Sequence, residues 1–430
     1  MNSLNFLFIS FSGLHVDLAW HVQKEGHAVK YYIRDKSDLT VGDGFVNKVT
    51  DWKAEVDWAD IIIFDDVLGQ GEMAEKLRKQ GKLVVGGTRY TDKLEDDRSF
   101  GQDELKKLKV GILPYKEFTD FDTAITYVKE HPDEYVIKPS GEAQNIKRLL
   151  FVGVEEDGSD VLRMLEAYKK VWSKVIKVFQ LQKKVNGVEV GIGAFFNGKK
   201  FVEPININFE HKKLFPGNVG PATGEMGTSM FWSAPNKLFA KTLKKMESKL
   251  AEEGFVGYID INTIVNGNGL YPLEFTSRFG YPTIQIQTDS MTTPVGEFLY
   301  NLASGHDNPF KVRKGFSVGV RMVAPPYPYG DQKIFDSHSK DAVIVFKKPG
   351  KEGIHIHDVR DVNGVWSLTG KSGLALVVVG QGLTMQQAKQ QAYRRIQNIL
   401  IPNVYYRSDI SDRWAEDSDK LHSWGYLHEL

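Results

Sequence analysis

The sequence predicts a multidomain protein that combines α/β, α+β and β-rich parts, and three observations support this prediction. The chain has 430 residues, more than one hydrophobic core usually serves. Strands and helices alternate through roughly the first 110 residues, a pattern typical of an open parallel sheet. Shorter strands, several joined by tight turns, dominate afterwards. We therefore expect an N-terminal open parallel α/β domain at 1–113, a central α+β domain at 114–312, a C-terminal β-rich domain at 313–415 and a polar, partly ordered tail at 416–430.

The composition narrows the class of partner. Lysine and arginine together number 55, as do aspartate and glutamate, so no net charge attracts nucleic acid or an anionic membrane. The absence of cysteine excludes thiol nucleophiles, disulfides and thiolate zinc sites, but it leaves open a hard metal on oxygen ligands. The apolar start lacks a basic flank, and no apolar run approaches the roughly twenty residues of a membrane helix. These observations predict a soluble, cytoplasmic protein that binds neither nucleic acid nor membranes.

The N-terminal part alternates buried strands with helices. Its apolar runs are short and continuous, as in strands that are covered on both faces. The predicted elements are strands at 5–10, 29–34, 58–64 and 82–86, and helices at 13–24 and 72–80. Because open α/β sheets bind ligands beyond the carboxyl ends of their strands, we expect a crevice above Gly13 and Asp65.

The central and C-terminal parts contain more strands than helices. A hairpin at 188–207 turns at Asn197-Gly198, a dipeptide with a strong turn preference. A helix at 384–400 begins at Thr384, and Gln387 stands at its capping-box position. Further strands are predicted at 134–138, 148–152, 177–183, 317–323, 341–346, 353–358, 365–367 and 374–380, and a polar helix is predicted at 236–253.

The most informative motif is a pair of acidic strands. Asp260 and Glu274 flank a turn at 266–269 that allows two antiparallel strands to place both acids on one face. Two nearby carboxylates repel each other unless a cation lies between them, so the spacing favours magnesium. Arg278 follows closely, where it would place a positive charge beside a phosphoryl group. The alternative is that one acid pairs with Arg278 or faces water.

Two other segments are candidates for binding an anion. Lys138 ends an apolar strand, from which its ammonium can reach a phosphate, although such a lysine is as often only solvated. The loop at 211–227 carries a basic triplet and many glycines, whose exposed N–H groups can bind an anion. This density favours a binding role over an ordinary surface loop.

Weaker signals lie near both ends of the chain. The turn at 11–13 resembles the start of a phosphate-binding turn but lacks the further glycines of the dinucleotide fingerprint. His355 and His357 alternate on a predicted strand, which is compatible with a metal site. A half-exposed pair on a strand explains them more economically.

Four segments together resemble phosphoribosylamine–glycine ligases (glycinamide ribonucleotide synthetases), which belong to the ATP-grasp superfamily. They are Glu210-His-Lys-Lys-Leu-Phe-Pro-Gly217, Gly220-Pro-Ala-Thr-Gly-Glu-Met-Gly227, Glu274-Phe-Thr-Ser-Arg-Phe-Gly280 and Tyr406-Arg-Ser-Asp-Ile410. The resemblance covers nearly the whole chain and implies an ATP-grasp fold for the central domain. It also implies an ADP-forming ligase in which ATP phosphorylates a carboxylate and an amine attacks the acyl phosphate. Magnesium or manganese would neutralise the phosphate charge.

The resemblance assigns roles to individual positions. Arg278 and Lys138 are the implied catalytic residues at the transferring phosphoryl group. The implied metal ligands are Glu274, Asp260 and Thr276. The implied ATP contacts are Arg98 and Lys138 at the phosphates, Leu181, Gln182, Lys183 and Val185 at the adenine, and Glu189 at the ribose. The implied substrate contacts are His211, Lys212, Thr223 and Gly224 on the carboxylate side and Gly13 on the amine side.

The amine side departs from the family pattern. The family's glycine-rich turn continues into Arg-Glu-His, where this chain has Leu-His-Val after Gly13, and a later Gly-Pro-Glu is replaced within 64–71. The family's Gly-Asp-Pro-Glu has become Gly-Tyr-Pro-Thr at 280–283. Losing an arginine beside a phosphate removes a charge-assisted hydrogen bond worth about 1.5 to 3 kcal/mol. We therefore predict an amine substrate other than phosphoribosylamine.

Two alternatives stay open. The first is a phosphoribosylamine–glycine ligase of purine biosynthesis with a rearranged pocket. The second is a catalytically weak nucleotide-binding regulatory homologue, favoured by Thr276 in place of a metal-binding asparagine and by a glycine-poor loop at 141–147. The retained loop at 211–227 favours glycine or another small amino acid as the carboxylate substrate. The expected assembly is a monomer or a small homo-oligomer.

Overall fold

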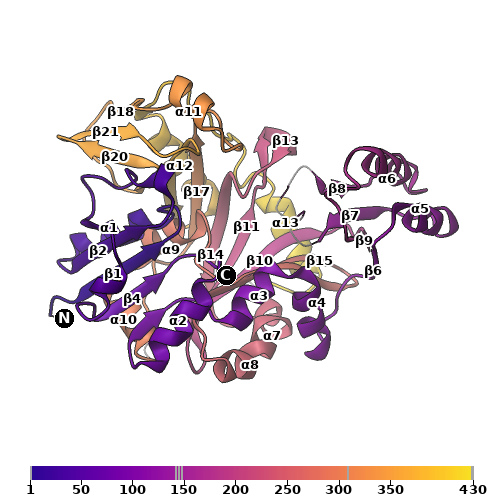
Figure 1. Cartoon of the computed structure of the whole chain (residues 1–430), viewed down its shortest axis with the longest axis horizontal. Helices are drawn as coiled ribbons and strands as arrows, with labels where there is room; N and C mark the ends of the chain where they lie inside the picture. Colours follow the sequence, from indigo (N-terminus) through magenta and orange to yellow (C-terminus); the bar gives the residue numbers. More distant parts are fainter. Residues whose placement is uncertain (1, 141–142, 144–145, 147–148, 308, 428–430) are drawn as a thin grey trace.

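The computed structural model describes residues 2–140, 143, 146, 149–307 and 309–427, and Figure 1 shows how its parts are arranged. Within those residues the strands form five sheets. A parallel sheet lies at one end, a small projecting sheet with two helices lies at the other, and a long antiparallel sheet connects them (Figure 1). The predicted mixture of α/β and α+β structure is confirmed. None of the described helices has the length and apolar character that crossing a bilayer requires.

The N-terminal sheet is parallel and open, as its alternating pattern predicts. Its strands are β1 (Asn5–Ser10), β2 (Ala28–Ile33), β3 (Lys48–Val49), β4 (Ile61–Phe64) and β5 (Leu83–Val85), and helices α1 (Val16–Lys24) and α2 (Gln70–Lys79) connect them. The strand order is β3-β2-β1-β4-β5, and every residue of β4 is buried. From β1 the chain adds β2 and β3 on one side, and it then returns to add β4 and β5 on the other side of β1. The direction in which strands are added therefore reverses between β1 and β4. A crevice is expected at the carboxyl ends of those two strands.

The projecting sheet has a hydrophobic core of its own. Its elements are β6 (Tyr115–Phe118), α5 (Phe121–Glu130), β7 (Tyr135–Pro139), β8 (Phe151–Val152), α6 (Ser159–Val171) and β9 (Phe179–Lys183). Ile137, Leu165 and Phe179 are buried in this core. Strand β9 pairs with β6 on one edge and β7 on the other. The strand predicted at 148–152 is shorter than expected, and residues 147–148 lie outside the described residues.

The long sheet joins the central and C-terminal parts of the chain. Its antiparallel strands, in spatial order, are β16 (Gly269–Thr276), β15 (Val256–Asn266), β10 (Val188–Asn197), β11 (Phe201–Glu210), β14 (Gly227–Ser233), β17 (Phe316–Val323), β22 (Leu374–Gly382) and β19 (Ile354–Ile356). Strand β14 pairs directly with β17, so the ladder continues across the domain boundary expected near residue 312. Helix α12 (Met385–Ile396) packs against β22 and β17.

The remaining elements cover this sheet or extend from it. Helices α3 (Arg89–Asp96) and α4 (Arg98–Lys107) lead from the parallel sheet to β16, and α9 (Thr283–Ser290) and α10 (Val295–Ala303) follow β16. The other elements are the hairpin β12 (Lys213–Phe215) and β13 (Val219–Ala222), helix α11 (Gln332–His338), and a small sheet of β18 (Val343–Phe346), β20 (Val359–Val362), β21 (Val365–Leu368) and β23 (Ile399–Leu400).

The single helix predicted at 236–253 is wrong. The segment divides into α7 (Lys237–Lys241), a 3-10 turn (Leu243–Met246) and α8 (Glu247–Glu252). The break occurs at Thr242, whose backbone angles are φ −124° and ψ −102° and whose hydroxyl donates to the carbonyl of Leu238. A threonine hydroxyl that bonds to the preceding turn competes with the helix, and the polar periodicity of the segment does not reveal this competition.

The predicted C-terminal elements also need correction. The expected polar tail contains helix α13 (Trp414–Ser423), and Leu421, Tyr426 and Leu427 are buried in the core of the long sheet. Three apolar residues are too few to produce a recognisable helical period, yet their burial orders the segment. Helix α12 ends at Ile396, and the next residues form β23 instead of extending it. Helices α9 and α10 were not predicted. Helix α9 buries polar residues and lacks an apolar stripe, whereas α10 buries Val295, Phe298, Leu299 and Leu302 at helical spacing, a signal that the sequence does carry.

Candidate functional site

A cavity of about 330 Å³ lies between the long sheet and the α3–α4 segment. Strands β11, β15, β16 and β17 contribute to its walls, together with the loop before β14. Ionisable side chains of both signs line it, and the cavity brings together several predicted site residues. These are Arg98, Lys212, Gly224, Asp260, Glu274, Thr276 and Arg278.

The register of β15 and β16 places the predicted metal acids on one face. Asp260 is opposite Thr276, and Asn262 is opposite Glu274. Because side chains alternate along a strand and directly opposed residues share a face, all four point the same way. The neighbouring β10 has glycine at position 193, where a Cβ would lie only 1.8 Å from the Tyr258 hydroxyl. The expected shared face is therefore present, and a small residue in β10 leaves room for it.

A single ammonium group connects three carboxylates at the centre of this face. Lys212 Nζ lies 2.9 Å from Glu189 Oε1, 3.0 Å from Glu274 Oε1 and 3.4 Å from Glu210 Oε2. Burial opposes the charge of Lys212, but the three glutamates outweigh it and raise its pKa well above the usual value. Burial also raises the pKa of Glu210 to about 7, despite the adjacent lysine. Sequence reasoning placed Lys212 on the substrate side and did not anticipate its contacts with the acids.

The carboxylate cluster also has the chemistry of a hard-metal site. Glu189, Glu210 and Glu274 offer oxygen donors from three different strands, and oxygen donors are the ligands that magnesium and manganese prefer. A cation already stands between them in the form of the Lys212 ammonium. Glu274 of this cluster, together with Asp260 and Thr276 on the same face, therefore offers oxygen donors that fit a divalent ion of this class.

Asp260 is held by neutral donors and not by a cation. Its Oδ2 accepts hydrogen bonds from Asn208 Nδ2 at 2.8 Å and from the Tyr258 hydroxyl at 3.0 Å. Burial raises its pKa to about 6. Thr276 lines the same cavity across the strand pair. Both predicted ligands thus lie beside the glutamate cluster.

Arg278 is anchored by acids from the N-terminal half of the chain. Its Nε and Nη2 both lie 3.1 Å from Glu95 Oε1, and Nε is 3.8 Å from Asp66 Oδ1. Ser277 N donates to the second Glu95 oxygen at 2.7 Å. Burial lowers the pKa of Arg278, but Glu95 and Asp66 outweigh burial and raise it. The guanidinium is therefore charged and fixed in orientation at the wall of the cavity.

The predicted phosphate-binding cations lie close enough to influence each other. Lys138 is the penultimate residue of β7 and is 8% exposed. Burial is the largest cause of its lowered pKa of about 7; the charge of Arg98 contributes to the lowering, and Glu274 opposes it. Arg98 Nη1 is buried and makes no hydrogen bond to the part of the chain that the structure describes. Lys138 and Arg98 thus bring two positive charges close together, and Arg98 has a donor without a partner among the described residues. This pair is suited to an anionic ligand.

The predicted adenine segment lies on β9, away from the cavity lining. Leu181, Gln182 and Lys183 belong to a strand that is paired on both edges. Lys183 N donates to the carbonyl of Pro114, and Lys184 N donates to that of Glu134. Backbone groups of β9 are therefore committed to the sheet. Val185 follows the strand, immediately after this ladder ends.

The predicted substrate loop is divided between the cavity and the protein interior. Gly224 and Lys212 line the cavity, whereas Thr223 N and Oγ1 both donate to the carbonyl of Lys212. His211 is buried, and burial lowers its pKa to about 3, aided by Arg413 and Arg407. His211 is thus a neutral imidazole behind the loop, outside the lining of the cavity.

The amine-side crevice combines residues that sequence reasoning did not connect. Gly13 has φ +85° and ends the turn after β1, and His15 and Asp65 follow β1 and β4. His15 Nδ1 lies 3.4 Å from Asp65 Oδ2, and burial lowers the pKa of His15. The His15 ring packs on Tyr281 at a centroid distance of 4.8 Å. The hydroxyl of Tyr281 and Asp65 Oδ1 are buried and make no hydrogen bond to the described residues.

The expectation of a half-exposed histidine pair is wrong. His355 is 1% exposed and His357 is 2% exposed. Strand β19 is at the edge of the long sheet, but helix α1 from the N-terminal part covers it. Sequence alone does not reveal that a helix more than three hundred residues away packs on this strand.

Comparisons with known proteins agree with this architecture. Residues 96–284 match the family described as phosphoribosylglycinamide synthetase, ATP-grasp (A) domain. A phosphoribosylamine–glycine ligase of Streptococcus pneumoniae is 24% identical over 357 residues, which is 81% of this chain and 82% of that protein. The crystal structure of phosphoribosylamine–glycine ligase from Thermotoga maritima gives a TM-score of 0.70 at 21% identity, covering 95% of this chain and all of that one.

A more distant structure shares the same fold. The biotin carboxylase domain of 2-oxoglutarate carboxylase from Hydrogenobacter thermophilus, solved with magnesium ADP and bicarbonate, gives a TM-score of 0.66 at 12% identity, with full coverage of both chains. The family match begins at α3 and ends in α9, and it therefore includes every strand that lines the cavity except β17. The central part of the chain therefore carries the ATP-grasp (A) domain of the phosphoribosylglycinamide synthetase family, and the chain as a whole is similar to phosphoribosylamine–glycine ligases.

Proposed function

We propose that the chain is an ATP- and magnesium-dependent ligase that joins a small carboxylate to an amine other than phosphoribosylamine. The observation that carries the reaction class is the convergence of Glu189, Glu210 and Glu274 on one cation beside the cavity. In this proposal, residues 1–113 supply the amine crevice, 114–312 supply the ATP and metal site, and 313–415 complete its walls.

The reaction takes place in two steps on the substrates. The γ-phosphoryl group of ATP passes to the carboxylate, and the amine then attacks the acyl carbon and displaces phosphate. Lys138 and Arg98 hold the ATP phosphates through their positive charges. Arg278 faces the transferring group, and its contact with Glu95 keeps it oriented without motion during the reaction. Backbone groups after Lys184 receive the adenine, and Glu189 accepts from the ribose.

Magnesium, held by Glu274 with Asp260 and Thr276, would neutralise the charge on the phosphates during transfer. Before it binds, Lys212 keeps Glu274 near Glu189 and Glu210, which limits repulsion among the carboxylates. With a divalent ion held by Glu274, the Lys212 ammonium would be released from that carboxylate. It then faces Gly224 and the carboxylate substrate, for which glycine or another small amino acid has the appropriate size.

The amine crevice favours a substrate that donates hydrogen bonds and carries no phosphate. Asp65 has a buried oxygen without a hydrogen-bond partner among the described residues, and Asp66 stands next to it with a pKa that burial raises to about 6. Acidic groups repel a phosphate and accept from amino or hydroxyl groups. Neutral His15 and the Tyr281 hydroxyl provide further polar contacts at the same place.

ADP release with a panel of amines tests this proposal. Glycine and ATP are held constant while phosphoribosylamine is compared with amino sugars, amino alcohols and diamines that lack phosphate. Release that depends on a phosphate-free amine supports the proposal. If phosphoribosylamine is the only amine that gives ADP release at an ordinary enzymatic rate, the proposal of a divergent amine is contradicted, whereas the ligase chemistry is supported. Failure of every pair of substrates would contradict the ligase function itself.

A second candidate is phosphoribosylamine–glycine ligase activity itself. It is favoured by the similarity to a protein of that name along 81% of this chain and by a further arginine at the cavity, Arg321, which is buried. Complementation of a strain that lacks this step of purine biosynthesis distinguishes the two candidates, since only the second predicts growth without added purine.

A further inference from the structure

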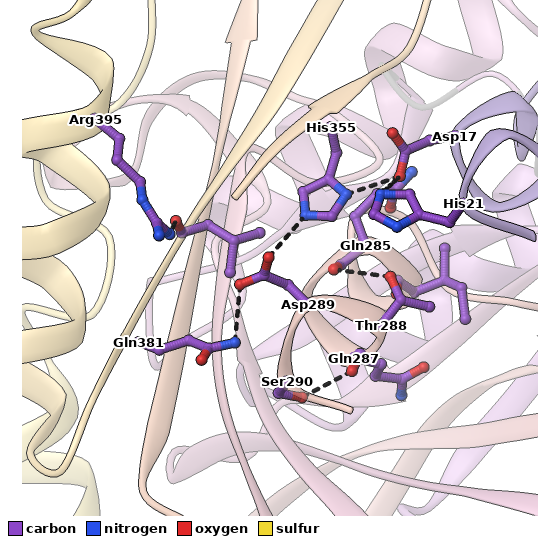
Figure 2. A network of polar contacts seen from close by, with 12 residues as sticks. Asp17, His21, Gln285, Gln287, Thr288, Asp289, Ser290, His355, Gln381 and Arg395 are labelled. Atoms are coloured by element: carbon purple, nitrogen blue, oxygen red, sulfur yellow. Dashed lines mark hydrogen bonds and ion pairs between the residues drawn. The ribbon is translucent and has the colours of Figure 1, made fainter. Parts of the chain in front are cut away.

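A second group of metal-binding side chains lies outside the cavity. Asp17 and His21 stand one turn apart on α1, and His355 reaches them from β19, near the other end of the chain (Figure 2). Asp17 and His355 are each 1% exposed, whereas His21 is 28% exposed. The group is therefore buried on one side and open to solvent on the other. No residue of the proposed ATP, metal or amine sites belongs to it.

The three side chains converge closely. His355 Nδ1 lies 2.7 Å from Asp17 Oδ2, and His21 Nε2 lies 3.6 Å from the same oxygen. One donor atom from each residue falls within 4.8 Å of those from the other two. The imidazole rings of His21 and His355 stack at a centroid distance of 5.3 Å, with 21° between their planes. Two imidazoles thus present nitrogens to one carboxylate.

Outer contacts hold these side chains in place. Ile356 N donates to the second Asp17 oxygen at 3.0 Å, which fixes the carboxylate. Asp289 Oδ1 lies 3.6 Å from His355 Nε2, on the side of the ring away from Asp17 (Figure 2). Asp289 is itself held by Gln381, whose Nε2 donates to Oδ2 at 2.8 Å. A carboxylate behind an imidazole in this manner fixes the tautomer that leaves the other nitrogen free to bind a metal.

We propose that Asp17, His21 and His355 form a binding site for a divalent transition-metal ion, of which zinc is the best match. Two imidazole nitrogens and one carboxylate oxygen are the donor set of many zinc sites, and the donors suit zinc better than magnesium. Three protein ligands leave one position for water or another small ligand on the exposed side of His21. The site would connect the parallel sheet to the end of the long sheet.

Metal binding requires only a small rearrangement. Donor atoms around tetrahedral zinc stand about 3.3 Å apart, so His355 Nδ1 and Asp17 Oδ2 would separate by roughly 0.6 Å. The ion takes the place of the proton between them, and that proton passes to solvent. The imidazole keeps its other N–H toward Asp289. Asp17 and His21 are already separated by a distance that fits a shared ion.

Calorimetric titration with zinc chloride tests the site in the full-length, chelator-treated protein without nucleotide. We expect one zinc ion per chain to bind at this site, apart from any divalent ion that the carboxylate cluster takes up. His21→Gln should weaken binding at least tenfold, because it removes one of three ligands while leaving the buried Asp17–His355 contact. The matched control is His422→Gln, which changes an exposed histidine on α13 and should leave the affinity unchanged. Glu274→Gln should also leave it unchanged, because that residue belongs to the other acidic cluster.

Cobalt supplies an independent readout. Cobalt(II) bound by two imidazoles and a carboxylate should give visible absorption bands in the wild-type protein, and these should be lost in His21→Gln. His355→Asn is a second variant, and its circular dichroism spectrum shows whether it has folded. Stoichiometric zinc binding that disappears with His21→Gln supports the proposal. Absence of binding by the wild-type protein overturns it, as does equal affinity in His21→Gln, since the cluster is then only a hydrogen-bonded contact between two parts of the chain.

Discussion

The two ends of the candidate site differ in how their polar groups are partnered. At the ATP and metal end, Glu189, Glu210 and Glu274 are held by Lys212, so that the acids have a cation before any ligand arrives. At the amine end, His15 and Asp65 are buried but poorly partnered. Buried polar atoms without partners are costly and usually indicate a ligand or water.

This difference indicates that one end of the candidate site sets the class of reaction and that the other end selects the amine substrate. The acids of the proposed metal end lie on β16, β10 and β11, which the ladder through β15 keeps in register regardless of the second substrate. The amine crevice is assembled from the ends of β1 and β4 and the segment after β16, and each of these can change independently. Under the proposed function, the metal end therefore sets the reaction class, and the amine crevice is the part that selects the second substrate.

The largest effect should come from Glu274→Gln. Removing one negative charge from the metal end should lower ADP formation about a hundredfold or more, because the ion that stabilises the transferring phosphoryl group loses a ligand. ADP release with the best substrate pair measures this effect. Glu166→Gln on the exposed face of α6 is the control and should retain full activity. Equal activity in the two variants would remove Glu274 from the metal site.

Asp65→Asn tests whether the amine end acts separately. We expect kcat/KM for the amine to fall about tenfold to a hundredfold, because the substrate loses an acceptor for its donors. The affinity for ATP, measured by calorimetry, should remain within about twofold, since Asp65 does not line the ATP cavity. Asp419→Asn on α13 is the control. If Asp65→Asn also lowered the affinity for ATP, the two ends of the site would be coupled. That result would contradict the separation of the ATP end from the amine end.

The buried lysine predicts a pH dependence at the ATP end. In the free protein the pKa of Lys138 is lowered to about 7, and bound phosphates should raise it. ATP affinity is therefore highest below pH 7 and should fall about tenfold between about pH 7 and 8.5, where only the bound form keeps its proton. Calorimetry in buffers of different ionisation enthalpy should show proton uptake above pH 7.

Lys138→Met distinguishes this effect from a general loss of affinity. The variant should bind ATP weakly with no decline across that pH range, whereas Lys170→Met, an exposed lysine on α6, should behave like the wild type. A decline of the same steepness in Lys138→Met would assign the titration to another group.

The smallest expected effect is on stability. Burial raises the pKa of Glu210 from 4.5 to about 7, so the folded state binds this proton more tightly than the unfolded state does. Its contribution to stability is full below about pH 4.5 and is lost as the pH rises to about 7. The glutamine in Glu210→Gln cannot ionise, so this variant avoids the loss of stability at high pH. It should therefore stabilise the ligand-free protein by on the order of 1 kcal/mol above pH 7.

Thermal denaturation at pH 5 and pH 8 measures this difference. The gain should be small at pH 5 and full at pH 8, and Glu166→Gln should show none at either pH. A destabilised Glu210→Gln at pH 8 would mean that the contact with Lys212 outweighs the cost of burying the carboxylate.

Prediction from sequence succeeded where the determining interactions are local. The alternation of short apolar runs and helices predicted the parallel sheet, since each run has the length of one buried strand. Prediction from sequence was less successful at Thr242, where one hydroxyl interrupts a helix. It was also less successful at α13, because the burial of that helix depends on a distant sheet. Such effects involve single contacts that leave no periodic pattern.

The sequence by itself determined that Asp260 and Glu274 share a face, because strand periodicity and a short turn between antiparallel strands leave few alternatives. Only the tertiary structure decided that Lys212 stands among the carboxylates and that His355 meets Asp17. Those contacts join residues far apart in the chain, and their distances depend on sheet order and on which helix covers which strand. Periodicity describes one element at a time, whereas the partners of a charged side chain are set by how the elements pack.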